Sequence, residues 1–131
     1  MAFVVLTAQR DLGILVLRIF VGILLAKHGY PKLVTPEGTK KWLAGLGIPV
    51  IFGPLIGVLE LLGGVFLVVG FLTPIVGFLF ALQFIGIILE GKKLGKKTLG
   101  DYEKDLFYLG AATAFIFLGG GMYSADNLLG L

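Results

Sequence analysis

The chain has 131 residues, of which 57% are hydrophobic and 15% charged, with a net charge of +3 and a mean hydropathy of +1.01. A soluble domain of this length leaves much of its surface in water and has about a quarter charged residues, so a soluble fold is excluded. With no cysteine and one histidine, the chain cannot form disulfides, thiolate metal sites or an all-histidine metal or haem site within one subunit. Composition therefore predicts one all-α integral membrane domain over residues 1–131.

Four apolar segments are candidates for crossing a bilayer, which takes about 20 residues. They cover residues 11–30, 50–72, 74–90 and 104–121. A tight hairpin at Thr73-Pro74 separates the second from the third, because proline suits the first turn of a helix. One continuous helix is the alternative, and Pro74 argues against it. The apolar runs do not alternate with polar residues as β-barrel strands would. The segments therefore predict a four-helix bundle.

The first segment has a second interpretation, a cleaved signal peptide. Lys27 and His28 stand where the small residues of a cleavage site would be expected, which disfavours cleavage.

Two charged loops indicate the orientation in the membrane. The first contains residues 39–46, a short amphipathic stretch predicted to lie in the interface with Trp42 as its anchor. All nine lysines fall at the loop end of the segments, at positions 27, 32, 40, 41, 92, 93, 96, 97 and 104. The positive-inside rule then places both loops in the cytoplasm and both termini outside a cytoplasmic membrane. The lysines either bind anionic lipid headgroups or serve only as orientation signals.

Polar side chains inside the segments form a layer within the membrane. A charge at the bilayer centre costs about 2.5–3.5 kcal/mol on insertion scales and usually has a partner. At about 1.5 Å per residue, Arg18 lies roughly 18 Å, Glu60 roughly 15 Å and Gln83 roughly 10–11 Å from the cytoplasmic edge. We expect Arg18 and Glu60 to face each other as a buried ion pair, with Gln83 close by. The pair either only stabilises the bundle or belongs to a pocket that binds a head group or carries protons.

Small residues lie near these charges and predict where the helices pack closely. The spacing is four residues in Gly22–Ala26, Gly53–Gly57 and Gly77–Ala81.

A second polar cluster is predicted near the cytoplasmic face. Its members are His28, Tyr30, Lys32, Glu90, Tyr102, Glu103, Asp105 and Tyr108. His28 changes charge near neutral pH and is a candidate ligand-binding or proton-transfer residue, although a structural role is the alternative. Glu90, Glu103 and Asp105 are the candidate proton-transfer partners. No spacing of ligands supports a metal site.

The order of these features resembles the DoxX family of integral membrane proteins, which includes DoxD-like members. The quoted stretches are Leu17 to Leu33, with Arg18, Gly22, His28-Gly29 and Lys32; Glu60-Leu-Leu-Gly-Gly64; Gly70-Phe-Leu-Thr-Pro74; and Gly119-Gly-Gly-Met-Tyr-Ser-Ala-Asp126. The resemblance implies four transmembrane helices in the cytoplasmic membrane of bacteria and archaea. It also links the chain to redox work at the membrane, since DoxD-type relatives are connected with thiosulfate:quinone oxidoreductase.

The leading hypothesis is a membrane subunit that binds a quinone-like redox ligand within the bundle and supports a membrane-associated oxidoreductase. Arg18, Glu60, Gln83 and His28 would bind the head group. Expected partners are membrane lipids, a partner oxidoreductase subunit or a second copy of the chain, and no nucleic acid. The alternative is a non-catalytic membrane scaffold or assembly factor, and a small-solute transporter is a third interpretation. The sequence does not decide whether the chain is an enzyme, nor does it identify the substrate, the partner or the oligomeric state.

Overall fold

The computed structural model describes residues 2–131, and the regular structure in that range is helical throughout. The helices are α1 (Ala2–Thr7), α2 (Arg10–Val34), α3 (Glu37–Leu46), α4 (Phe52–Val69), α5 (Thr73–Leu89), the 3-10 helix η1 (Gly91–Leu94), α6 (Leu99–Leu118) and α7 (Ala125–Leu129). The all-α class predicted from the sequence is confirmed.

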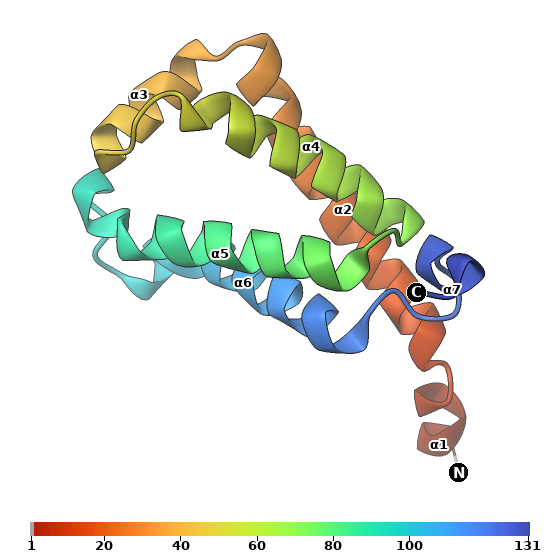
Figure 1. The fold of residues 1–131 in the computed structure, drawn as a ribbon. Coiled ribbons are helices and arrows are strands. Elements are labelled where there is room, and N and C mark those ends of the chain that lie inside the picture. Colours follow the sequence, from red (N-terminus) through yellow and green to blue (C-terminus); the bar gives the residue numbers. More distant parts are fainter. Residues whose placement is uncertain (1) are drawn as a thin grey trace.

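The four long helices form two close pairs, α2 with α4 and α5 with α6 (Figure 1). The first pair is close because glycine faces glycine. A Cβ atom at Gly22 would lie 2.5 Å from the carbonyl oxygen of Gly64, and one at Gly64 would lie 2.6 Å from the backbone nitrogen of Ala26. Any larger residue would push these backbones apart, so the predicted close packing around Gly22–Ala26 is confirmed.

The second pair is close for the same reason, and aromatic residues join the two pairs. A Cβ at Gly77 on α5 would lie 2.7 Å from the carbonyl oxygen of Ala112 on α6. Phe80, also on α5, is buried and reaches across to Gly63 on α4. The buried apolar cluster continues through the rings of Phe84 and Tyr108 toward α3.

The two ends of the molecule differ. The turn between α4 and α5 lies at one end with α7, while α3 and η1 lie together at the other (Figure 1). Lys93 Nζ donates a hydrogen bond to the carbonyl of Leu46 at 3.2 Å, which links the two charged loops. The two loops therefore share one end, as the sequence predicted.

Several helix bounds differ from those predicted. Helix α2 does not end at Tyr30 but continues through Pro31 to Val34, where the Pro31 carbonyl accepts hydrogen bonds from the backbone N–H and the hydroxyl of Thr35. Helix α6 begins at Leu99 rather than 104, because Thr98 and Asp101 form a capping box ahead of it. The short helices α1, η1 and α7 were not predicted.

The outward faces of the long helices are apolar. Helices α2 and α4 are long and apolar enough to cross a membrane, and α5 is apolar but shorter. Large exposed side chains include Phe20, Leu55, Phe78, Leu82 and Phe117. So many exposed apolar side chains would be a liability in water and suit contact with lipid.

Candidate functional site

Buried polar side chains gather at two levels of the molecule, not in one layer. One group surrounds Arg18, near the end that carries α7, and the other surrounds Glu60, nearer α3. Arg18 is fully buried and Glu60 is 3% exposed. Each group satisfies its own charge with different partners.

Arg18 is held by backbone carbonyls. Its guanidinium donates to Leu67 O and Val68 O, both at 3.4 Å, and to Tyr123 O at 2.5 Å. The carboxylate of Asp126 also interacts with it electrostatically. The predicted Arg18–Glu60 ion pair is therefore wrong.

The error came from the helix ends used to estimate depth. Arg18 is 16 residues (34 − 18) from the observed end of α2, whereas Glu60 is 8 residues (60 − 52) from the start of α4. The two counts differ by eight residues, which correspond to about 12 Å of helix. The two charges therefore cannot lie level in an antiparallel pair. The predicted end at Tyr30 made the distance from Arg18 to the end of the first helix four residues too short.

Glu60 pairs instead with Lys32. Lys32 Nζ lies 2.5 Å from Glu60 Oε2, and Gln83 Nε2 donates to Glu60 Oε1 at 2.6 Å. The predicted proximity of Gln83 to Glu60 is confirmed. Lys32 also donates to the His28 carbonyl at 3.3 Å and lies 5.9 Å from the centre of the Trp42 ring. The Lys32–Glu60 pair was not predicted, because the first segment was expected to end before Lys32.

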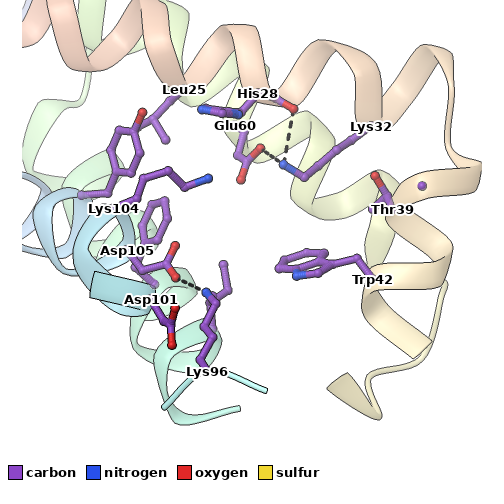
Figure 2. A pocket seen from close by; sticks show the side chains of 14 residues that line it. Leu25, His28, Lys32, Thr39, Trp42, Glu60, Lys96, Asp101, Lys104 and Asp105 are labelled. Carbon is purple, nitrogen blue, oxygen red and sulfur yellow. Dashed lines mark hydrogen bonds and ion pairs between the residues drawn. The ribbon is translucent and has the colours of Figure 1, made fainter. Parts of the chain in front are cut away.

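A cavity of about 380 Å³ opens beside this pair (Figure 2). Its volume lies within the range typical of small-molecule sites. Figure 2 shows Lys32 and Lys104 reaching into it from α2 and α6. Residues from α2 to α6 line it: Leu25, His28, Lys32, Gly38, Thr39, Trp42, Glu60, Phe84, Ile87, Lys96, Asp101, Lys104, Asp105 and Tyr108.

Aromatic rings form one wall of the cavity. The Tyr108 ring stacks on Phe84 with centroids 5.2 Å apart, and His28 meets Tyr108 edge-on at 6.2 Å. Trp42 lines another part of the cavity from α3. The cavity thus combines flat apolar surfaces with hydrogen-bonding groups.

The other predicted proton-transfer residues are divided between the cavity and the surface. Asp105 lines the cavity and accepts from Lys96 Nζ at 2.6 Å. Glu103 is exposed on α6, and Glu90 pairs with Lys93 at 2.5 Å at the end of α5. Neither carboxylate is among the residues that line the cavity with His28.

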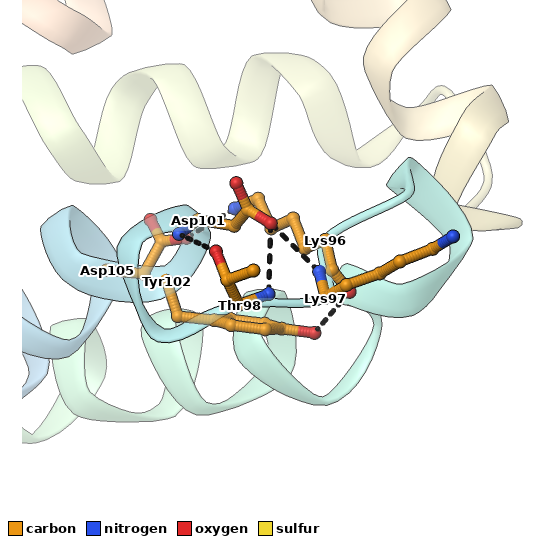
Figure 3. A network of polar contacts seen from close by, with 6 residues as sticks. All are labelled: Lys96, Lys97, Thr98, Asp101, Tyr102 and Asp105. Carbon is orange, nitrogen blue, oxygen red and sulfur yellow. Dashed lines mark hydrogen bonds and ion pairs between the residues drawn. The ribbon is translucent and has the colours of Figure 1, made fainter.

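The loop before α6 holds the cavity's edge through a polar network (Figure 3). Asp101 Oδ2 accepts from the backbone N–H groups of Lys97 and Thr98 at 2.9 and 3.1 Å. These two hydrogen bonds hold the pKa of Asp101 below its usual value. The Tyr102 hydroxyl donates to Lys96 O at 3.2 Å, and its ring lies 5.7 Å from Lys96 Nζ. The network therefore fixes Lys96 where it meets Asp105.

An all-helical architecture, an apolar exterior and buried polar clusters between helices define an integral membrane protein of the helical class. The chain belongs to the DoxX family, whose model matches residues 13–91. The family recognised from the sequence motifs is thereby confirmed.

Relatives from two bacteria agree with this assignment. The putative oxidoreductase CatD of Bacillus subtilis is 38% identical over 99 residues, covering 76% of this chain and 73% of that protein. The inner membrane protein YqjF of Escherichia coli is 31% identical over 92% of this chain and 94% of its own length. The inner membrane protein YphA of the same organism is 27% identical, with 92% of each chain covered. No solved structure matches the chain.

Proposed function

We propose that the protein is a multi-pass membrane subunit in which α2, α4, α5 and α6 cross the bilayer as a four-helix bundle and α3 lies in the interface. The inner-membrane relatives and the apolar outward faces of these helices support this arrangement. All nine lysines lie in α3, in η1, in the loop after η1 or in the halves of α2 and α6 that adjoin them. By the positive-inside rule the end that carries α3 and η1 faces the cytoplasm, and both termini lie outside.

The cavity between the helix pairs binds a quinone-like redox ligand in this proposal. The observation that carries it is the cluster of the buried Glu60 with the half-buried Lys32 and Gln83 beside the aromatic wall of the cavity. A quinone presents carbonyl oxygens, which accept hydrogen bonds from ammonium or imidazole N–H groups, and a flat ring, which stacks on aromatic side chains. Lys104 and His28 line the cavity and carry ammonium and imidazole N–H groups of this kind.

Reduction of a quinone also needs protons, which the cavity can supply. Asp105, His28 and Tyr108 line the same space, and the cavity lies toward the end proposed to be cytoplasmic. General acids within hydrogen-bond reach of a carbonyl oxygen are what such a step requires. Arg18 has no part in this proposal, because it is bonded at the opposite end.

Redox function has support from one relative, which is named a putative oxidoreductase. The chain has no cysteine, so a thiol-based step would need a partner subunit. We therefore propose that electrons reach the cavity from a partner oxidoreductase. The scaffold interpretation predicts instead that the Lys32–Glu60 pair only stabilises the fold.

The test is mass spectrometry of organic extracts from protein purified in mild detergent. Wild type is compared with Glu60→Gln, which removes the charge that holds Lys32 and Gln83. The matched control is Glu37→Gln on α3, whose carboxylate is exposed and lies 3.5 Å from Lys40. We expect a stoichiometric quinone-like lipid in wild type and in the control, and at least about tenfold less in Glu60→Gln, equivalent to about 1.4 kcal/mol of binding.

A second variant covers the case in which Glu60→Gln fails to fold. Lys104→Met removes an exposed cation that lines the cavity, so its cost to stability is expected to stay below about 0.5 kcal/mol. A folded Lys104→Met protein that retains as much lipid as wild type would refute the head-group site, whether or not Glu60→Gln folds. Extracts without any small molecule would favour the scaffold interpretation.

A further inference from the structure

A second hollow adjoins the polar cavity. It measures about 390 Å³ and lies between α4 and α5. Its lining is apolar apart from Gln83 and comprises Trp42, Ile48, Phe52, Leu55, Ile56, Leu59, Leu79, Leu82, Gln83, Gly86 and Ile87. Leu55, Leu79 and Leu82 are exposed, so this groove is open to whatever surrounds the helices.

The groove and the cavity meet at shared side chains. Trp42 and Ile87 line both hollows, one from α3 and one from α5. On one side of this boundary lie ammonium, carboxylate and imidazole groups, and on the other side lie leucine and isoleucine side chains. The change from polar to apolar lining is what a molecule with a polar head and a hydrocarbon chain requires.

Gln83 lines the groove, contacts the cavity residue Glu60 and has an unused hydrogen-bond acceptor. Its Nε2 donates to Glu60, while its Oε1 is buried and has no hydrogen-bond partner among the described residues. The amide cannot be reversed to avoid this, because its oxygen would then face the Glu60 carboxylate. A buried carbonyl oxygen without a donor is costly, and a ligand hydroxyl or N–H group placed there would satisfy it.

We infer that the cavity takes a long-chain lipid that enters between α4 and α5, with its head in the cavity, its chain in the groove and a head-group donor on Gln83 Oε1. This inference rests on the proposed function and adds the chain, the entry route and the role of Gln83. We assign the groove to the chain of the bound lipid because Trp42 and Ile87 line both hollows. A bulk lipid or a partner helix would occupy the groove independently of what binds in the cavity.

The single tryptophan makes the test direct. Quinones quench tryptophan fluorescence at short range, and Trp42 lines both hollows. Purified full-length protein in one detergent is titrated with two probes, a benzoquinone carrying only methyl substituents and the same ring carrying a decyl chain. The ratio of the two affinities, compared between variants, cancels the partition of the decyl probe into micelles.

Gly86→Leu is the test variant and Gly110→Leu its control. A Cβ at either position meets no atom within 4 Å, so both positions have room for the first atom of a side chain. Gly86 lines the groove, whereas Gly110 is exposed on α6 and lines neither hollow. We expect Gly86→Leu to weaken binding of the decyl probe about tenfold, as loss of contact with a few methylene groups would. The methyl probe should change less than about twofold, and Gly110→Leu should affect neither probe.

A Gly86→Leu protein that binds both probes as wild type does, or loses both equally, would overturn the groove assignment while leaving head-group binding intact in wild type. Failure of both probes to quench wild-type Trp42 would reject the proposed function itself, and the groove inference with it. Gln83→Leu tests the hydrogen bond to Gln83 Oε1 separately. This variant should weaken the binding of both probes when they are chemically reduced to hydroquinones. Unchanged hydroquinone binding would overturn the role of Gln83 Oε1.

Discussion

Gly70 allows the Arg18 guanidinium to pass against the backbone at the end of α4. Its φ is +74°, a conformation that glycine adopts freely, and a Cβ there would collide with Arg18 Nη1. We predict that Gly70→Ala destabilises the protein by about 3 kcal/mol or more, from backbone strain together with displacement of a buried charge. Thermal unfolding in mild detergent, followed by circular dichroism, measures the change.

Gly95→Ala separates the two contributions. Gly95 also has a positive φ, +80°, but a Cβ there meets no atom within 4 Å. Its cost should be about 1–2 kcal/mol, from the backbone conformation alone. Equal losses for the two variants would show that Arg18 does not depend on the space at Gly70.

Sequence reasoning identified the important polar residues better than it identified their partners. Arg18, Glu60 and Gln83 were recognised because charged and amide groups are rare within apolar segments, and all three are partnered in the structure. The partner of Glu60 was not predicted, because the first segment was expected to end at residue 30, before Lys32. Backbone carbonyls as partners of Arg18 carry no sequence signal, since every residue has one.

At the scale of elements, the start of α6 depends on one carboxylate. Asp101 accepts hydrogen bonds from the backbone N–H groups of Lys97 and Thr98, and these bonds lower its pKa. The carboxylate therefore stays ionised to a lower pH in the folded state than in the unfolded chain. Stability from this group is therefore complete above the unfolded pKa of about 3.9 and is lost as pH falls through the lower folded value. We predict that Asp101→Asn lowers stability near neutral pH and weakens the loss of stability below about pH 4.

The measurement is thermal unfolding in detergent from about pH 3 to about pH 6. Glu103→Gln, an exposed carboxylate on the same helix, is the control for a general change of charge. If Asp101→Asn and Glu103→Gln gave the same pH profile, the capping box would have no measurable effect on acid stability.

Helix existence was easier to predict than helix ends. The long apolar segments and the amphipathic α3 were expected, because their composition and periodicity are strong signals. The turn at Thr73-Pro74 was also correct, since α5 begins at Thr73. The true end of α2 depends on Thr35 bonding to the Pro31 carbonyl, and the start of α6 depends on the capping box. Both are local contacts that hydropathy does not register.

At the scale of the whole molecule, the two helix pairs are fastened at the end opposite the cavity. Asp126 accepts from the backbone N–H groups of Leu72 and Thr73, at 2.6 and 2.9 Å, which satisfies the first turn of α5. Its own N–H donates to Gly70 O, and the neighbouring Tyr123 carbonyl accepts from Arg18. The segment after α6 thereby joins both pairs at the end opposite the cavity.

We predict that Asp126→Ala destabilises the protein by about 3–5 kcal/mol, because it leaves the backbone N–H groups of Leu72 and Thr73 without an acceptor and removes the negative charge nearest to the buried Arg18. Asp11→Ala is the matched control, since Asp11 also ties this segment to α2, through the Met122 N–H at 3.0 Å, but in an exposed place. That loss should be about 1 kcal/mol or less. Unfolding by titration with sodium dodecyl sulfate in mixed micelles measures both. Equal and small losses in the two variants would mean that apolar packing alone holds this end of the molecule together.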